Sequence, residues 1–143
     1  MINANPYLNF AGNTEEAMNF YKTVFGGEFI AFHRFKDSPG HEKMPKHEQE
    51  MIMHASLPLG PGTILMATDV LESMGQTLTH GNNFHIAVNT ESEEETDKIF
   101  KGLCAGGKIE MPLNKTFWGA YFGMCKDKFG VLWMISYDAN QKL

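Results

Sequence analysis

The chain has 143 residues and a formal net charge of −5, with 43% hydrophobic and 20% charged residues. This size and composition fit one compact globular unit or two small repeats that share a core. The acidic balance argues against a nucleic-acid partner, and no apolar run is long enough to cross a bilayer. The first residues also lack the pattern of a signal peptide, so we expect a soluble cytoplasmic protein without a membrane partner.

The first part of the chain predicts a strand, a helix and a second strand. Residues 6–11 alternate between apolar and polar side chains, as strands do. Asn13 is expected to cap a helix that ends at Gly26 and Gly27, because glycine adopts the left-handed conformation at a helix end. Residues 28–35 follow as a strand. The expected apolar stripe of the helix consists of Ala17, Phe20, Tyr21, Val24 and Phe25.

The middle of the chain predicts a loop, a hairpin and a connector. Residues 37–48 carry many charges together with glycine and proline, which is typical of a loop. Residues 50–57 and 63–69 predict two strands, and the turn 58–62 joins them into a hairpin. Residues 70–82 are rich in polar and turn-forming residues and predict a connector.

The same order of elements returns in the second half. Residues 83–88 predict a strand that places His85 on its polar face. Ser92 and Glu95 form a capping box ahead of a second helix, which the glycine pair 106–107 ends. Three further strands are expected at residues 108–113, 118–125 and 131–137, with the aromatic residues from Phe117 to Phe122 clustered on the second of them.

The spacing of these elements indicates an internal duplication. The two glycine pairs lie 80 residues apart, and the leading strands lie 78 residues apart, measured from Leu8 to Ile86. We therefore predict an α+β fold, a single domain made of two βαβββ modules forming a cupped mixed sheet. The modules cover about residues 1–69 and 83–143. The sheet faces that carry no helix would line a shared cleft.

Cysteine and methionine usage indicates packing more than chemistry. Cys104 and Cys125 are the two cysteines, and their spacing suits neither a redox motif nor a disulfide framework. We expect both to be reduced, packed thiols. The ten methionines are numerous for this length, and several fall on predicted strands. They either pack in the core or line an adaptable pocket.

Three stretches make the sequence resemble the vicinal oxygen chelate superfamily, which includes glyoxalase I, bleomycin-resistance proteins, fosfomycin-modifying enzymes and extradiol dioxygenases. They are residues 16–26, 84–88 and 127–133. The run Phe-Tyr-x-x-Val-Phe-Gly-Gly and the ending Phe-Gly-x-x-Trp look like the PhnB-like branch, often labelled 3-demethylubiquinone 3-methyltransferase. The resemblance covers nearly the whole chain and implies the duplicated fold. It does not imply one activity, because the scaffold carries unrelated chemistries.

The resemblance also implies a place for a metal. Family members with activity usually bind a divalent metal through one side chain each from strands one, four, five and eight. Carried over to this sequence, these positions fall near Pro6, at Met66 or Asp69, at His85 and at Met134. A divalent metal is therefore a possible cofactor, but three of the four usual ligand positions are not matched.

Two interpretations of the polar residues stay open. His54, Asp69 and His85 would form a two-histidine, one-carboxylate set for a metal. Alternatively, polar side chains would anchor a ligand without metal, and His85 would be the first candidate for catalysis. The expected ligand-binding residues are Tyr7, Asn9, His54, Asp69, His85 and Trp118.

Three functions follow from these interpretations. The first is a PhnB-like small-molecule-binding protein or metal-independent enzyme of unknown substrate. The second is a divalent-metal-dependent lyase, isomerase or dioxygenase. The third is sequestration of a drug or toxin without turnover. Each takes a small-molecule ligand as partner, and we expect the chain to form a homodimer, as many relatives do.

Overall fold

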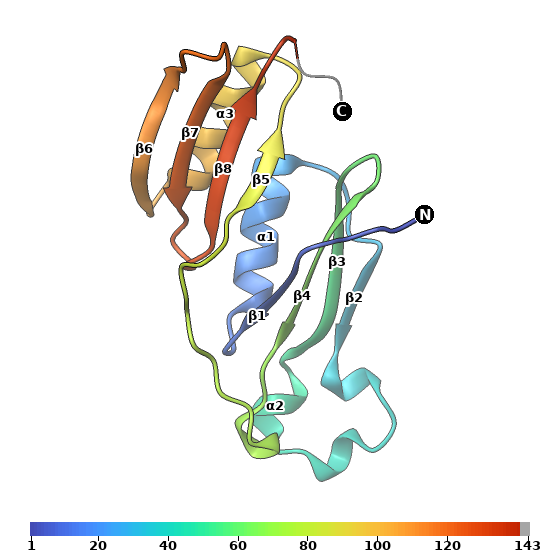
Figure 1. Cartoon of the computed structure of the whole chain (residues 1–143). Helices are drawn as coiled ribbons and strands as arrows, with labels where there is room; N and C mark the ends of the chain where they lie inside the picture. Colours follow the sequence, from blue (N-terminus) through green and yellow to red (C-terminus); the bar gives the residue numbers. More distant parts are fainter. Residues whose placement is uncertain (141–143) are drawn as a thin grey trace. The chain divides into compact units, whose positions relative to one another are not determined.

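The computed structural model describes residues 1–140 and contains two compact units, each with one four-stranded sheet (Figure 1). Unit 1 is Met1–Thr79 and unit 2 is His80–Leu143, so the division falls inside the predicted connector. Residues 141–143 of the predicted second module lie outside the described residues. Helices and mixed sheets in both units confirm the α+β class. In residues 1–140, no helix has the length and apolar character needed to span a membrane.

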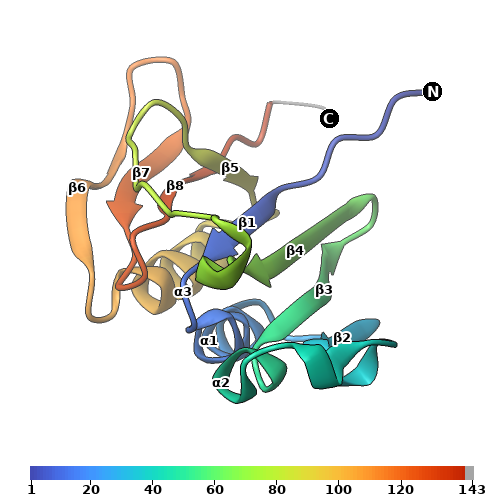
Figure 2. The ribbon, with the colours of Figure 1, turned by 90° about the horizontal axis from the view of Figure 1, so that it is seen from below.

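Unit 1 packs one helix against a mixed sheet. Its main elements are β1 (Tyr7–Phe10), α1 (Thr14–Phe25), β2 (Ala31–Arg34), β3 (Ile52–Gly60) and β4 (Thr63–Asp69). The strand order is β1-β4-β3-β2, with β1 parallel to β4 and the other pairs antiparallel. Figure 2 shows α1 beside β3, and α1 contacts both β3 and β4. The antiparallel pairing of β3 with β4 confirms the predicted hairpin of the third and fourth strands.

The core of unit 1 lies between α1 and one face of its sheet. The strand residues that α1 covers are almost completely buried: Leu8, Phe10, Ala55, Leu57, Leu65 and Ala67. From the helix, the fully buried residues are Thr14, Ala17, Met18 and Tyr21. The predicted stripe was wrong in part, because Met18 belongs to it while Phe20, Val24 and Phe25 are only half-buried.

The predicted loop 37–48 is instead a series of short helical turns. They are η1 (Phe35–Asp37), η2 (His41–Lys43) and α2 (Lys46–Gln49), and a similar turn, η3 (Glu72–Met74), lies in the connector. Local backbone hydrogen bonds hold them, for example Met44 N to His41 O at 2.9 Å and Glu48 N to Pro45 O at 3.0 Å. A polar sequence can form such turns because they need no apolar face.

Unit 2 repeats the arrangement of unit 1. Its elements are β5 (Ile86–Asn89), α3 (Glu93–Cys104), β6 (Lys108–Lys115), β7 (Tyr121–Lys126) and β8 (Leu132–Tyr137). The strand order β5-β8-β7-β6 matches that of unit 1, and β5 is parallel to β8. In Figure 1, α3 lies behind this sheet. Matching topology in the two units is what a duplication predicts.

Two predicted strand boundaries in unit 2 were wrong. The strand β5 begins at Ile86, so His85 precedes it, and Phe84 is 66% exposed. The strand β7 begins at Tyr121, so Trp118 lies in the turn between β6 and β7. The bonds of Thr116 N to Ala120 O and Gly119 N to Thr116 O make this turn.

The core of unit 2 surrounds Trp133. Trp133, Ile135 and Cys125 are fully buried, and α3 contributes Phe100 and Leu103. Both cysteines are free, as expected. Burial raises the pKa of the Cys125 thiol and, to a smaller extent, that of Cys104, so both are protonated at neutral pH.

Candidate functional site

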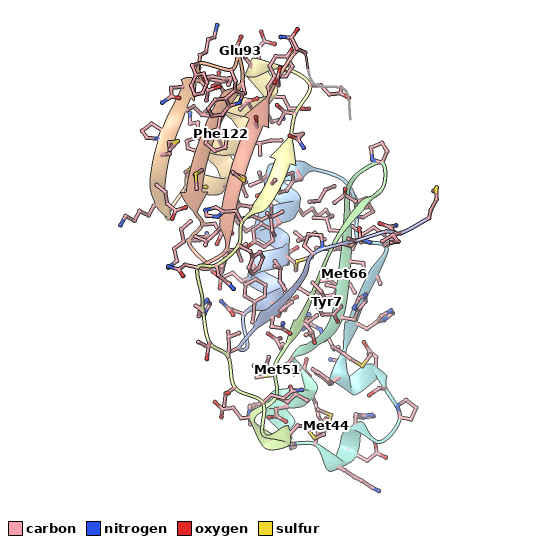
Figure 3. All side chains as sticks on the ribbon, viewed as in Figure 1. Tyr7, Met44, Met51, Met66, Glu93 and Phe122 are labelled. Atoms are coloured by element: carbon pink, nitrogen blue, oxygen red, sulfur yellow. The ribbon has the colours of Figure 1, made fainter. Side chains whose placement is uncertain are left out.

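The open face of the unit 1 sheet carries polar residues at the centre of the sheet. Leu8 and Phe10 point toward α1, so Tyr7 and Asn9 lie on the opposite face. Tyr7 pairs in register with Met66 on β4, and Met66 pairs with Ser56 on β3. Figure 3 labels Tyr7 and Met66 on these neighbouring strands. Residues from three strands thus form one row on this face.

A network of hydrogen bonds between side chains crosses this row. The Tyr7 hydroxyl lies 3.1 Å from Nδ1 of His54, and Nε2 of His54 lies 2.6 Å from the Ser56 hydroxyl. Tyr7 is 47% exposed, whereas Ser56 is 4% exposed. This hydrogen-bond network therefore runs from solvent to the interior of unit 1. An imidazole between two hydroxyls can accept a proton on one nitrogen and release one from the other.

The remaining polar groups of this face surround the hydrogen-bond network. Asn9 is exposed two residues beyond Tyr7, and its register partner is Thr68. His33 on β2 is the register partner of His54 and is also exposed. The structure thus brings together three of the predicted site residues, Tyr7, Asn9 and His54, on one face. The pairing of His33 with His54 could not be predicted from sequence, because strand register depends on a contact between distant segments.

Asp69 lies inside unit 1, with an exposure of 2%. Its Oδ1 accepts hydrogen bonds from the Gly12 and Thr14 amides at 2.9 and 3.1 Å and from the Thr14 hydroxyl at 2.7 Å. Its Oδ2 accepts one from the Ile52 amide at 2.9 Å. Asp69 thus holds the start of α1, where the side chain of Asn13 makes no capping bond. We therefore assign Asp69 a structural role and leave it out of the proposed site.

His85 belongs to unit 2 and has its own partner. Its Nε2 lies 3.1 Å from Oε1 of Glu110 on β6, and the two side chains are 20% and 35% exposed. A carboxylate beside an imidazole orients the ring. Glu110 could not be predicted from sequence, because nothing in the local pattern links β6 to the start of β5.

Trp118, the last of the predicted ligand-binding residues, lies on an exposed turn. It is 57% exposed and packs edge to face against Phe117, with ring centroids 5.0 Å apart and an interplanar angle of 89°. Phe117 is 98% exposed. An aromatic pair on a turn presents apolar area to a ligand or to another protein.

The residues do not fit the metal that the resemblance implies. Of the carried-over positions, His85 and Asp69 are of residue types that usually bind a divalent metal, and both oxygens of Asp69 already accept hydrogen bonds. Among residues 1–140, no three side chains of His, Cys, Asp or Glu form a group that could hold a metal ion. The set of His54, Asp69 and His85 is therefore not brought together within either unit.

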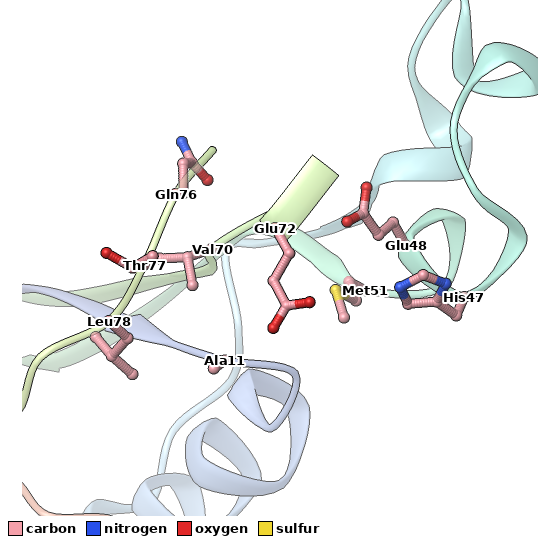
Figure 4. Close-up of a pocket in the computed structure, with 9 residues that line it drawn as sticks. All are labelled: Ala11, His47, Glu48, Met51, Val70, Glu72, Gln76, Thr77 and Leu78. Carbon is pink, nitrogen blue, oxygen red and sulfur yellow. The ribbon is translucent and has the colours of Figure 1, made fainter. Parts of the chain in front are cut away.

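A pocket of about 460 Å³ lies elsewhere in unit 1 (Figure 4). It is lined by Ala11, His47, Glu48, Met51, Val70, Glu72, Gln76, Thr77 and Leu78. Glu48 is 1% exposed, and its carboxylate accepts hydrogen bonds from the Ser73 hydroxyl and, at 3.1 Å, from the Ser73 amide. The pocket wall is therefore held together by a contact between α2 and η3. A glutamate in a segment of many charges gives no sign of such burial in the sequence.

The contact of Glu48 with Ser73 predicts a pH-dependent stability. The hydrogen bond from the Ser73 hydroxyl lowers the pKa of Glu48 below its ordinary value. A lowered pKa stabilises the fold above the ordinary carboxyl pKa, and this contribution is lost as pH falls through the folded pKa. We expect Glu48→Gln to lower the urea midpoint at pH 7 and to lower it progressively less as the pH falls below the ordinary carboxyl pKa. Glu72→Gln, at an exposed position of the same pocket, is the control and should leave the midpoint unchanged.

Comparisons with known proteins identify the family of this fold. The model of the glyoxalase/bleomycin resistance protein/dioxygenase superfamily matches residues 4–135. The chain belongs to this superfamily. The family that the sequence resembles is therefore confirmed.

Relatives place the chain in a branch of the superfamily. Protein YjdN of Escherichia coli (strain K12) is 35% identical, and the match covers 95% of each chain. Protein PA1353 from Pseudomonas aeruginosa has a similar crystal structure, with a TM-score of 0.84, 36% identity and coverage of 96% and 98%. A Bacillus cereus PhnB protein, described as a putative 3-demethylubiquinone-9 3-methyltransferase, has a TM-score of 0.73, 31% identity and coverage of 94% and 98%. These likenesses support the PhnB-like branch.

Proposed function

We propose that the chain binds a small organic molecule on the open face of the unit 1 sheet and does so without a resident divalent metal. The observation that carries this proposal is the chain of hydrogen bonds from Tyr7 through His54 to Ser56. An exposed hydroxyl connected to an imidazole can donate to or accept from a polar group of a ligand. A small-molecule site needs a few such polar groups on an otherwise apolar surface.

The side chains around this hydrogen-bond network indicate the kind of ligand. Met66 lies between Tyr7 and Ser56 in the register of the strands, and its thioether is half-buried. Thioethers and phenol rings contact flat apolar groups favourably. The proposed ligand therefore combines an aromatic or other flat apolar part with a hydroxyl or carboxylate that reaches Tyr7 and His54.

The same geometry supports proton transfer if the ligand is turned over. His54 can take a proton from the ligand side while its second nitrogen donates to Ser56, or the reverse. Sequestration without turnover uses the same contacts. Product analysis of a bound ligand separates the two.

The proposal includes a cytoplasmic homodimer. Exposed apolar side chains such as Ile30, Phe117 and Trp118 offer surface for a second copy of the chain.

Substitution of His54 provides the direct test of this site. We expect saturation-transfer NMR with a panel of phenols, aromatic carboxylates and α-hydroxy acids to detect binding by the unchanged protein. His54→Ala should weaken that binding at least about tenfold, and Tyr7→Phe by about five- to tenfold, because each removes a polar partner of the ligand. His41→Ala is the matched control, since His41 is a histidine of unit 1 in η2 and should leave binding unchanged.

Two results would contradict the proposal. Equal binding by the unchanged protein and by His54→Ala, or no binding of any panel member at millimolar concentration, would remove the site from this face. One equivalent of a divalent metal in the purified protein, lost in His85→Ala, would favour the metal-dependent alternative.

A further inference from the structure

The open face of the unit 2 sheet carries three methionines in one row. Met111 on β6 pairs with Met124 on β7, and Met124 pairs with Met134 on β8. Residues paired across antiparallel strands share a face and have Cα atoms about 4.5–5.5 Å apart. Three neighbouring thioethers therefore project from adjacent strands on the same side of the sheet.

This row lies on the side away from α3. Cys125, Trp133 and Ile135 alternate with the methionines along β7 and β8, and they are fully buried on the side that α3 covers. Met124 and Met134 are half-buried, and Met111 is 41% exposed. The thioethers are thus accessible without being dispersed over the surface.

A β-bulge brings a carboxylate to the same face. Ile109 pairs with Cys125 and Met111 pairs with Met124, so two steps along β6 match one step along β7. Glu110 is the extra residue, and its side chain reaches His85 at 3.1 Å. Bulges commonly redirect a side chain in this way.

The pair of His85 and Glu110 extends across this face. His85 directly precedes β5 and Glu110 lies on β6, and these are the two edge strands of the sheet. In a flat sheet three spacings of about 4.8 Å would separate such strands, so the contact at 3.1 Å requires a curved sheet. Ala87 pairs with Met134, and His85 precedes Ala87 by two residues, so the alternation of β5 places His85 on the face that carries the methionines.

The hydrogen bond to Glu110 leaves one nitrogen of His85 free to bind a ligand. Its Nε2 faces Glu110, and Nδ1 makes no hydrogen bond to any described residue. A histidine that binds a metal through one nitrogen usually donates its other N–H to a carboxylate. The arrangement therefore provides an oriented imidazole on the same sheet face as the row of thioethers.

From these contacts, we propose that the open face of unit 2 is a binding site for a soft monovalent metal ion, Cu(I) or its redox-inert analogue Ag(I). Thioether sulfur selects Cu(I) among biological metals, whereas divalent ions of the harder class prefer oxygen ligands. Met124, Met134 and His85 would be the central ligands, with Met111 at the edge. Glu110 would act as a positioning residue that holds the imidazole.

The test follows the methionine methyl groups during a titration with silver nitrate. Full-length protein with [methyl-¹³C]methionine gives one signal for each of its ten methionines. Cys104→Ala protein is used, because a half-buried thiol competes for Ag(I). We expect the signals of Met111, Met124 and Met134 to shift and to saturate at one equivalent of Ag(I), while Zn(II) moves none of them.

Variants separate a built site from general thioether affinity. Met124→Leu/Met134→Leu conserves side-chain volume and should lower Ag(I) affinity at least about a hundredfold, and Glu110→Gln should lower it about tenfold. Met74→Leu, which removes a methionine that is 72% exposed in the connector, is the control and should bind as before. Unmoved signals for the three methionines, or an equal shift of Met74, would overturn the proposal. Ag(I) binding that persists in His54→Ala would show that it does not depend on the unit 1 site.

Discussion

Replacing Asp69 with alanine is expected to lower the free energy of unfolding by about 3–5 kcal/mol. The substitution removes the acceptor of three backbone amides, those of Gly12, Thr14 and Ile52, and of the Thr14 hydroxyl. Asp69 is 2% exposed, so water does not replace these bonds freely. Each buried donor left without a partner costs about 1–3 kcal/mol, and partial relaxation keeps the total below the full sum. A loss of this size is a large part of a typical domain stability of about 5–15 kcal/mol.

Circular dichroism during guanidinium unfolding measures this loss. Fluorescence is less suitable, because the two tryptophans, Trp118 and Trp133, both belong to unit 2. Asp37→Ala is the matched control, since Asp37 is exposed and accepts one bond, from the Arg34 amide at 2.9 Å. We expect it to cost about 1 kcal/mol, as loss of a cap does. Equal costs for the two variants would mean that Asp69 does not join α1, β3 and β4.

The order of elements could be predicted because it depends on local patterns. Alternation, helical periodicity and glycine ends are properties of short windows, and they gave both helices and the hairpin that ends at Asp69. The equal spacing of the two halves added the duplication, which the matching strand orders of the two units now support. Element boundaries were less accurate where turns interrupt a pattern, as at His85 and Trp118.

The candidate site could be predicted only as separate residues. The polar faces of the strands identified Tyr7, Asn9 and His54, but the hydrogen bond of Tyr7 to His54 joins residues 47 positions apart. The partner of His85, Glu110, lies on the opposite edge strand and comes into reach at a bulge. For Asp69, the sequence suggested a ligand, because a carboxylate at a strand end has the same local pattern whether it binds a ligand or caps a helix. Its four donors are 17 to 57 residues away.

Gly107→Ala is expected to lower the free energy of unfolding by about 3 kcal/mol, the upper end of the usual cost of overpacking. A Cβ at this position would lie 2.2 Å from the Lys126 carbonyl oxygen and 2.9 Å from the Asp127 Cα. Both are backbone atoms, and Asp127 is fixed by bonds from Phe129 N, Val131 N and Trp133 Nε1. The end of β7 would have to move, and Trp133 with it. Unfolding followed by tryptophan fluorescence therefore reports the change.

The control for this prediction separates the cost of steric overlap from the cost of a left-handed backbone conformation. Gly75 has φ of +75° and nothing within 4 Å of its added Cβ, so Gly75→Ala should cost only about 1–2 kcal/mol of left-handed strain. The same contrast distinguishes the two glycine pairs of the duplication. Gly26 and Gly27 both have positive φ, whereas Gly107 does not and is required by the close approach of Lys126. If Gly107→Ala costs no more than Gly75→Ala, the repeated spacing of the pairs reflects helix ends alone, and the packing of α3 against β7 does not require a glycine.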